Sequence, residues 1–167
     1  CTKLSIRHNI ALPNLDLICG KGGVINTKIE EELCDKAVAD LTIKTPNLDV
    51  DAGTLSGGNQ QKVLLAKWMF AEPDILILDE PTRGIDVGAK VEIYQLMNQL
   101  KKQGIAVMFV SSEMPEVMGV ADRIIVMCDG RITGEVMAKE TTQNDILKYA
   151  TSFENKLGSQ SQNNKEE

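Results

Sequence analysis

The fold is decided by the stretch Ile75-Leu-Ile-Leu-Asp-Glu-Pro81, in which four apolar residues run straight into two acids and a proline. An apolar run without alternation predicts a strand buried on both faces, as in a parallel sheet that helices cover. Open α/β sheets bind ligands at the carboxyl ends of their strands. We therefore expect a buried strand over 75–78 that delivers Asp79 and Glu80 to a ligand-binding edge. One acid there suits the water shell of Mg²⁺ and the other a water that attacks phosphorus, although two such acids alone are also typical of a solvated loop.

Helical and strand-like patterns alternate on both sides of this strand. Upstream, residues 27–41 and 60–70 repeat apolar residues at helical spacing, whereas Pro13 and several glycines interrupt any period in residues 1–26. Downstream, the patterns predict a helix over 89–103, strands over 105–110, 123–128 and 131–137, a turn at Asp129–Gly130, and short helices from Pro115 and over 144–150. Strands separated by helices predict a mostly parallel α/β sheet flanked by helices.

A glycine-rich stretch, Leu55-Ser-Gly-Gly-Asn-Gln60, opens the second upstream helix. Two glycines at a helix start let backbone N–H groups approach an anion, and the helix dipole favours negative charge there. Taken alone, the stretch is equally typical of a helix that Ser56 simply caps. Together with the two acids after the strand, it favours a site for a terminal phosphate.

Composition and charge exclude several classes of protein. The chain has 18 Lys and Arg against 24 Asp and Glu, a formal charge of −6, so its acidic surface disfavours nucleic acid as a partner. The longest apolar runs, such as Ile105–Val110, are far shorter than the roughly 20 residues that span a bilayer, and no signal peptide opens the chain. The four cysteines form no C-x-x-C pair, so we expect no zinc site, no disulfides and a reducing cytoplasm.

The order of these motifs resembles that of the ATP-binding cassette (ABC) proteins, in which a signature, a Walker B strand and a D-loop follow one another. Here they correspond to Leu55–Gln60, Ile75–Glu80 and Gly84–Asp86. The resemblance covers about residues 1–150. It implies a P-loop NTPase-like cassette fold, an α/β sheet flanked by helices together with part of the helical signature subdomain.

The resemblance also implies a domain organisation. Residues 1–71 correspond to part of the helical signature subdomain and residues 72–150 to the C-terminal part of the ATPase core. Residues 151–167 have a polar composition that predicts a disordered tail. The sequence of residues 54–62 and 81–90 is similar to that of the second cassette of the duplicated monosaccharide importers for ribose, xylose and galactose. Three further stretches favour the galactose/methyl-galactoside type: Lys44–Pro46, Glu92–Leu96 and Thr141–Asn144.

The resemblance implies a role for each of eight residues. Those expected to contact ATP seated on a partner cassette are Ser56, Gly57, Gly58 and Gln60. Those expected at this cassette's own nucleotide are Asp79, which holds Mg²⁺ through water, Glu80, the catalytic base, and Ser112, at the switch position. Asp86 is expected on the dimer seam. The cofactors implied are ATP and Mg²⁺.

The sequence departs from the family pattern at two places. It contains no G-x-x-x-x-G-K-[ST] motif, because Cys19-Gly-Lys-Gly-Gly23 has the letters without the spacing. It therefore resembles the C-terminal part of a cassette without the N-terminal Walker A strands, and we expect the isolated chain to be inactive. Ser112 stands where the family has a switch histidine, and a hydroxyl brings no titratable imidazole. We expect two unequal ATP sites, in which the signature matters more to turnover than Asp79 and Glu80.

The function implied is that of an ABC-type ATPase driving monosaccharide import. Its implied partners are a second cassette, membrane permease subunits and, through the permease, a sugar-binding protein, which places it peripherally on the cytoplasmic face of the membrane. One alternative is a catalytically silent cassette whose signature completes the partner site. Another is an ABC protein acting on ribosomes or DNA, which the acidic composition disfavours.

Four other residues have plain structural interpretations. Lys62 and Lys67 are expected on a solvated face of the signature helix, and Trp68 in its packed face. His8, the one histidine, is expected to be exposed.

Overall fold

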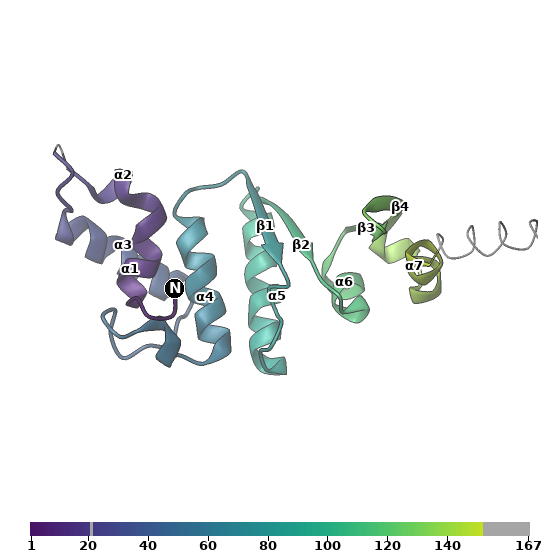
Figure 1. Cartoon of the computed structure of the whole chain (residues 1–167), viewed down its shortest axis with the longest axis horizontal. Helices are drawn as coiled ribbons and strands as arrows, with labels where there is room; N and C mark the ends of the chain where they lie inside the picture. Colours follow the sequence, from purple (N-terminus) through teal and green to yellow (C-terminus); the bar gives the residue numbers. More distant parts are fainter. Residues whose placement is uncertain (21, 152–167) are drawn as a thin grey trace, which may run out of the picture. The chain divides into compact units, whose positions relative to one another are not determined.

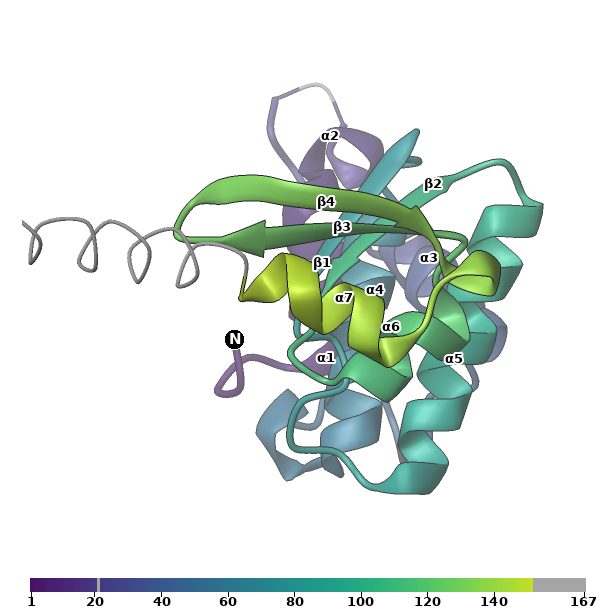
Figure 2. The same ribbon diagram turned by 90° about the vertical axis from the view of Figure 1, so that its right-hand side faces the viewer.

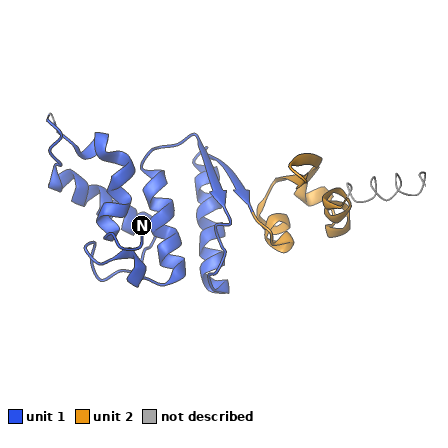
Figure 3. Ribbon diagram, viewed as in Figure 1, with its two compact units in different colours: residues 1–110 blue, residues 111–167 orange. Residues whose placement is uncertain are grey.

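The computed structural model describes residues 1–20 and 22–151, so the predicted disordered tail lies outside the described residues except for Thr151. The chain divides into two compact units, residues 1–110 and residues 111–167 (Figure 3). In the described part of the chain, none of the helices combines the length and the apolar composition needed to cross a membrane.

The first unit is mostly helical, and its C-terminal part holds two strands with a long helix between them in the chain (Figure 1). Its elements are α1 (Ile6–Ala11), a short 3-10 helix (Leu12–Asn14), α2 (Leu15–Ile18), α3 (Thr27–Asp40), a second 3-10 helix (Ala52–Thr54), α4 (Gly57–Met69), β1 (Ile75–Asp79), α5 (Val87–Lys102) and β2 (Ala106–Val110).

Helices α1, α3 and α4 pack against one another. Ile6 and Ile10 lie one turn apart on α1 and are completely buried, as is Cys34 on α3. Burial in this apolar site raises the pKa of the Cys34 thiol to about 11, because desolvation disfavours the thiolate. The side-chain amide of Asn9 donates to the carbonyls of Cys1, Leu4 and Ser5, which satisfies the polar groups at the start of α1. Residues 1–18, which belong to the stretch without a clear sequence pattern, thus contribute to a helical core.

Helix α5 buries the face that its periodicity predicts, with Ile93, Leu96, Met97 and Leu100 all buried. It begins at Val87 rather than at residue 89, because the Asp86 side chain accepts a hydrogen bond from the backbone N–H of Ala89 and caps the first turn. After the helix, Gly104 takes a φ of +93°, which glycine adopts without strain.

Strands β1 and β2 pair in parallel, with Ile75 opposite Ala106 and Asp79 opposite Val110. Figure 2 shows the two strands side by side. The prediction that this strand is buried on both faces is wrong for the described residues: Leu76 and Leu78 are buried, but Ile75 and Ile77 are each 63% exposed. Helix α5 packs against β2, so the sheet has one buried face and one exposed apolar face.

The second unit is built around a β-hairpin. Its elements are α6 (Met114–Val120), β3 (Arg123–Cys128), β4 (Arg131–Met137), a 3-10 helix (Ala138–Glu140) and α7 (Gln143–Ala150). The strands pair antiparallel through a two-residue turn, in which Asp129 and Gly130 both have positive φ, at 49° and 72°. A primed hairpin turn requires this conformation, and the predicted turn is confirmed. Ile124, Val126, Ala138 and Ile146 form the core of this unit.

Candidate functional site

The glycine-rich stretch forms the exposed start of α4. Ser56 is the N-cap residue, but its side chain makes no capping bond to the first-turn N–H groups. Its hydroxyl oxygen instead accepts a hydrogen bond from the side-chain amide of Asn59 at 2.9 Å. The simple capping interpretation of Ser56 is therefore wrong. A helix start without a side-chain cap leaves N–H donors that can bind an acceptor from outside the helix.

The two glycines of the stretch lie against the segment 84–89. A Cβ added at Gly58 would meet the Cβ of Ala89 at 2.5 Å, and one added at Gly57 would meet Ile85 Cγ2 at 3.3 Å. Gly58 is buried, so only a residue without a side chain fits this close helix approach. The structure thus brings the predicted signature together with the predicted D-loop of the same chain.

Asn59 and Gln60 hold the loop before α4 in place. The Gln60 side-chain amide donates to the backbone carbonyl of Leu55 at 2.8 Å, and the side-chain oxygen Oδ1 of Asn59 accepts from the backbone N–H of Lys44 at 2.9 Å. Asn59, which links Ser56 to the loop after α3, was not among the residues predicted for the site. The ATP contact expected of Gln60 stays a prediction.

Asp79 and Glu80 lie at the carboxyl end of β1, as the sequence predicts. Asp79 is exposed, and Glu80 is half-buried with a φ of +46°, a left-handed conformation that is uncommon outside glycine. The Glu80 N–H donates to the Val110 carbonyl at 2.9 Å and the Glu80 carbonyl accepts from Arg83, so β2 and the following turn hold this conformation. Backbone strain of this kind costs about 1–3 kcal/mol and is concentrated at functional sites.

The chain offers carboxylate oxygen for Mg²⁺ at this strand end. Mg²⁺ in phosphate sites keeps several waters and takes only one or two carboxylates, with substrate phosphates completing its shell. The exposed Asp79 side chain fits that requirement. Within residues 1–20 and 22–151, no group of three or more His, Cys, Asp or Glu side chains gathers closely enough to hold a metal by itself.

The two remaining predicted site residues lie in different units. Asp86 is exposed at the start of α5, where its carboxylate caps the helix. Ser112 is exposed in the second unit, just before α6. Its neighbour Ser111 hydrogen-bonds the Glu116 carboxylate and accepts from the backbone N–H of Glu113 at 3.0 Å. The dimer-seam and switch roles stay predictions.

Two expectations about the helix α4 are wrong. Lys62 is buried rather than solvated, because its ammonium finds two oxygen acceptors: the Thr42 carbonyl at 3.0 Å and the Glu92 carboxylate at 2.7 Å. Trp68 is 46% exposed rather than packed, and the Lys67 ammonium lies 5.5 Å from its ring centroid. The exposed position of His8 is confirmed.

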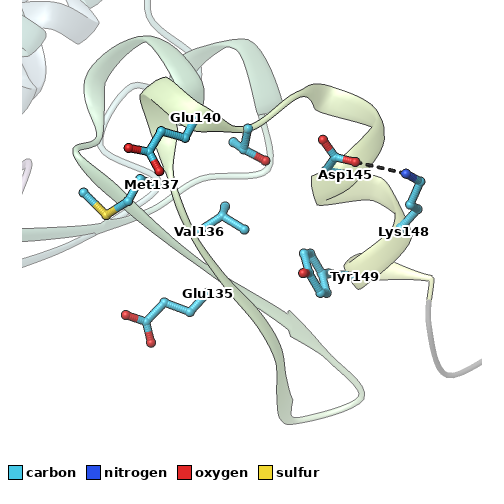
Figure 4. Close-up of a pocket in the computed structure, with 8 residues that line it drawn as sticks. Glu135, Val136, Met137, Glu140, Asp145, Lys148 and Tyr149 are labelled. Carbon is cyan, nitrogen blue, oxygen red and sulfur yellow. Dashed lines mark hydrogen bonds and ion pairs between the residues drawn. The ribbon is translucent and has the colours of Figure 1, made fainter.

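A groove of about 620 Å³ opens in the second unit, between β4 and α7 (Figure 4). Glu135, Glu140 and Asp145 make its lining acidic, and Asp145 pairs with Lys148 at 3.0 Å. None of the eight predicted site residues lines it. The start of α4 and the end of β1 therefore remain the candidate site.

The chain is similar to known proteins in both sequence and fold. Residues 3–83 match the family model described as ABC transporter. A dimeric ATP-binding cassette solved with ADP and phosphate superimposes with a TM-score of 0.69 at 22% identity. The superposition covers 84% of this chain and 60% of the chain of that structure. An ABC transporter in an inward-facing conformation superimposes with a TM-score of 0.76 at 17% identity, over 90% of this chain and 59% of its own. The chain thus has the ABC cassette fold and is similar in sequence to ABC transporter ATP-binding proteins.

Sequence relatives are found among the sugar importers. The ribose import ATP-binding protein of Bacillus subtilis is 56% identical over 147 residues, which is 88% of this chain and 30% of the relative. The xylose import ATP-binding protein of Thermoanaerobacter pseudethanolicus is 49% identical over 150 residues, and the galactose/methyl galactoside import ATP-binding protein of Clostridium tetani is 46% identical over 150 residues. Each of these two matches covers 90% of this chain and 30% of the relative. The chain thus spans about 30% of the length of these relatives.

Proposed function

We propose that this chain belongs to the ATP-hydrolysing component of a monosaccharide importer. The observation that carries the proposal is the exposed start of α4, where Ser56 leaves the first-turn N–H groups without a side-chain cap. Such donors suit the terminal phosphate of ATP. The 46–56% identity to import ATP-binding proteins for three sugars supports sugar uptake as the process that ATP drives.

The mechanism assigns separate tasks to the two ends of the site. Glu80 orients a water for in-line attack on the γ-phosphate and accepts its proton, and Asp79 holds the water shell of Mg²⁺. The metal, when bound, neutralises charge on the phosphates. The N–H groups around Ser56–Gly58 stabilise the charge that develops on the phosphoryl oxygens of ATP seated on a second cassette. Gln60 supports this loop, and Asp86 lies on the seam between the two cassettes.

The assembly has three kinds of partner. A second cassette completes each ATP site, permease subunits form the path through the membrane, and a sugar-binding protein delivers the substrate to the permease. The chain then works peripherally on the cytoplasmic face of the membrane. The sugar is proposed as a class, since the ribose, xylose and galactose/methyl galactoside relatives all match closely. The stretches Lys44–Pro46, Glu92–Leu96 and Thr141–Asn144 favour the galactose type, which uptake of labelled galactose against ribose tests.

The proposed ATP sites are unequal, with the signature contributing more to turnover than this chain's own carboxylates. ATPase rates of the complete native protein with its permease test this. We expect Gly57→Asp to lower kcat by ~100-fold or more, because it places a carboxylate among the phosphate-binding donors. We expect Glu80→Gln to lower kcat by a smaller factor, and Glu140→Gln, an exposed acid outside the site, to have no effect. Equal or reversed effects of the first two variants contradict the asymmetry.

Ser112 favours a second candidate, a catalytically silent cassette whose signature serves only the partner site. A serine hydroxyl at the switch position donates one hydrogen bond and cannot titrate near neutral pH. This candidate requires Glu80→Gln to leave kcat unchanged while Gly57→Asp abolishes it. A measurable loss with Glu80→Gln contradicts it.

A further inference from the structure

The second turn of α4 carries a lysine in an unusual place. The Lys62 side chain is only 5% exposed, and an ammonium withdrawn from water costs several kcal/mol unless partners compensate it. Two acceptors do so: the Thr42 carbonyl at 3.0 Å and the Glu92 carboxylate at 2.7 Å. These acceptors belong to the loop after α3 and to α5, so one buried charge joins α4 to the segments on both sides of it.

The Thr42 acceptor is held by the end of α3. Thr42 has a φ of +50°, which is a rare conformation for a β-branched residue. Two hydrogen bonds close the helix end around it, from the Thr42 N–H to the Ala39 carbonyl at 3.2 Å and from the Ile43 N–H to the Val38 carbonyl at 2.9 Å. The carbonyl that Lys62 binds is therefore held in place by backbone hydrogen bonds at the end of α3.

The Glu92 acceptor is held by α5. The Glu92 side chain is about half exposed. The hydrogen bond from Lys62 and the charge of Lys62 nevertheless keep the pKa of the Glu92 carboxyl below its ordinary value. The carboxylate is thus charged at neutral pH, and it ties α4 to the helix that Asp86 caps. A charge-assisted bond of this length is among the stronger polar contacts in proteins.

The ion pair continues a contact made by the signature glycines. One turn before Lys62, Gly58 packs against Ala89 so closely that an added Cβ would lie 2.5 Å from the alanine Cβ. Gly57 lies against Ile85 in the same way, at 3.3 Å for an added Cβ. A steric contact and an ionic contact therefore fix α4 against α5 at successive turns, on the side where α4 begins.

We propose that Lys62 and Glu92 are positioning residues for the signature. Their pair fixes the first turn of α4 relative to the segment 84–86, so that the signature donors and Asp86 meet the partner's ATP as one preassembled surface. The inference rests on the proposed function. Preorganised donors stabilise a transition state because they need no rearrangement during the reaction, and a displacement of about 1 Å can cost ~100-fold in rate.

The test compares variants of the complete native protein assembled with its permease. Glu92→Ala removes the exposed member of the pair, and Gln95→Ala on the same helix, also exposed, is the matched control. We expect Glu92→Ala to lower kcat for ATP by ~10-fold while KM stays near that of the control, because the donors are less well aligned. It should also lower the unfolding temperature, because the buried Lys62 ammonium loses one of its two acceptors, so kcat is measured at a temperature at which both variants are fully folded. Lys62→Arg should retain more of kcat than Lys62→Met. The double variant Lys62→Met/Glu92→Ala should be no worse than Lys62→Met alone.

Two outcomes overturn the proposal. In the first, Glu92→Ala has the same kcat as Gln95→Ala. In the second, kcat falls only in proportion to the loss of folded protein, measured by circular dichroism at the assay temperature. Gly57→Asp in the same series separates this failure from that of the proposed function. If Gly57→Asp abolishes turnover and Glu92→Ala has no effect, only the positioning role is wrong. If Gly57→Asp leaves turnover intact, the proposed role of the signature is wrong.

Discussion

The two regions predicted to handle ATP differ in how firmly this chain holds them. The start of α4 is fixed by buried contacts, with Gly58 against Ala89 and the Lys62 ammonium between two acceptors. The end of β1 is held by pairing with β2 and by the Glu80 turn, while Ile77 on the same strand is largely exposed. Packing inside this chain thus sets the geometry of the signature. The positions of Asp79 and Glu80 depend instead on the pairing of only two strands.

The largest expected difference comes from truncating one isoleucine on α5, the helix that packs against α4, and one on β1. Ile93 on α5 is fully buried and Ile77 on β1 is 63% exposed. We expect Ile93→Ala to lower the free energy of unfolding by about 2–5 kcal/mol and Ile77→Ala by less than about 1 kcal/mol, because only the first leaves a cavity. Urea unfolding of the purified chain measures both. Similar losses would mean that the strand face is covered in solution.

Gly58→Ala tests the contact between α4 and α5. The added Cβ has no room beside Ala89, so the helices must shift apart, at a cost of about 1–3 kcal/mol that exceeds the gain in helix propensity. Ala89→Gly removes the opposing methyl group. The double variant Gly58→Ala/Ala89→Gly should therefore recover stability relative to Gly58→Ala, as urea unfolding would show. A double variant at least as unstable as Gly58→Ala would contradict this contact.

Asp86→Ala separates helix capping from any role between cassettes. Loss of the bond to the Ala89 N–H should lower stability by about 1 kcal/mol, whereas Asp86→Asn keeps a capping oxygen and should lower it by much less. Thermal unfolding followed by circular dichroism measures the difference. If Asn and Ala are equally destabilising, the carboxylate charge matters more than the cap.

The smallest expected effect is a pH dependence of the Lys62–Glu92 pair. The pKa of Glu92 lies below its ordinary value of 4.5, because Lys62 favours the charged form. The stabilisation is therefore complete above about pH 4.5 and is lost as the pH falls through the lower, folded-state pKa. The stability difference between the wild type and Glu92→Gln should shrink over that interval. A difference that stays constant from pH 7 to pH 3 would contradict the pairing.

The sequence predicted the elements of this fold well where the structure of a segment depends mainly on its own residues. The strands over 123–128 and 131–137 and the Asp129–Gly130 turn are confirmed with those bounds, because a β-prone run and a primed turn act over neighbouring residues. The short helices α1 and α2 were missed, because helices of six and four residues depend on burial against α3 and α4 rather than on their own propensity.

The site was predicted in its motifs but not in the contacts that hold them. Asp79 ends β1 and Glu80 follows it, and α4 begins directly after Ser56, as the sequence indicated. The burial of Lys62 was missed because a lysine on an amphipathic helix normally faces water, and the partner that changes this, Glu92, lies on another helix. A charged residue is buried by tertiary pairing, which no single-helix pattern reveals.

The exposed indole of Trp68 gives this chain a built-in optical reporter. It is the single tryptophan of the sequence, and it lies on the same helix as the phosphate-binding stretch, beside the Lys67 ammonium. Because its ring is half in water, its fluorescence emission responds to changes in hydration and to the distance of that cation. Movement of this helix can therefore be followed by intrinsic fluorescence, without attaching a dye.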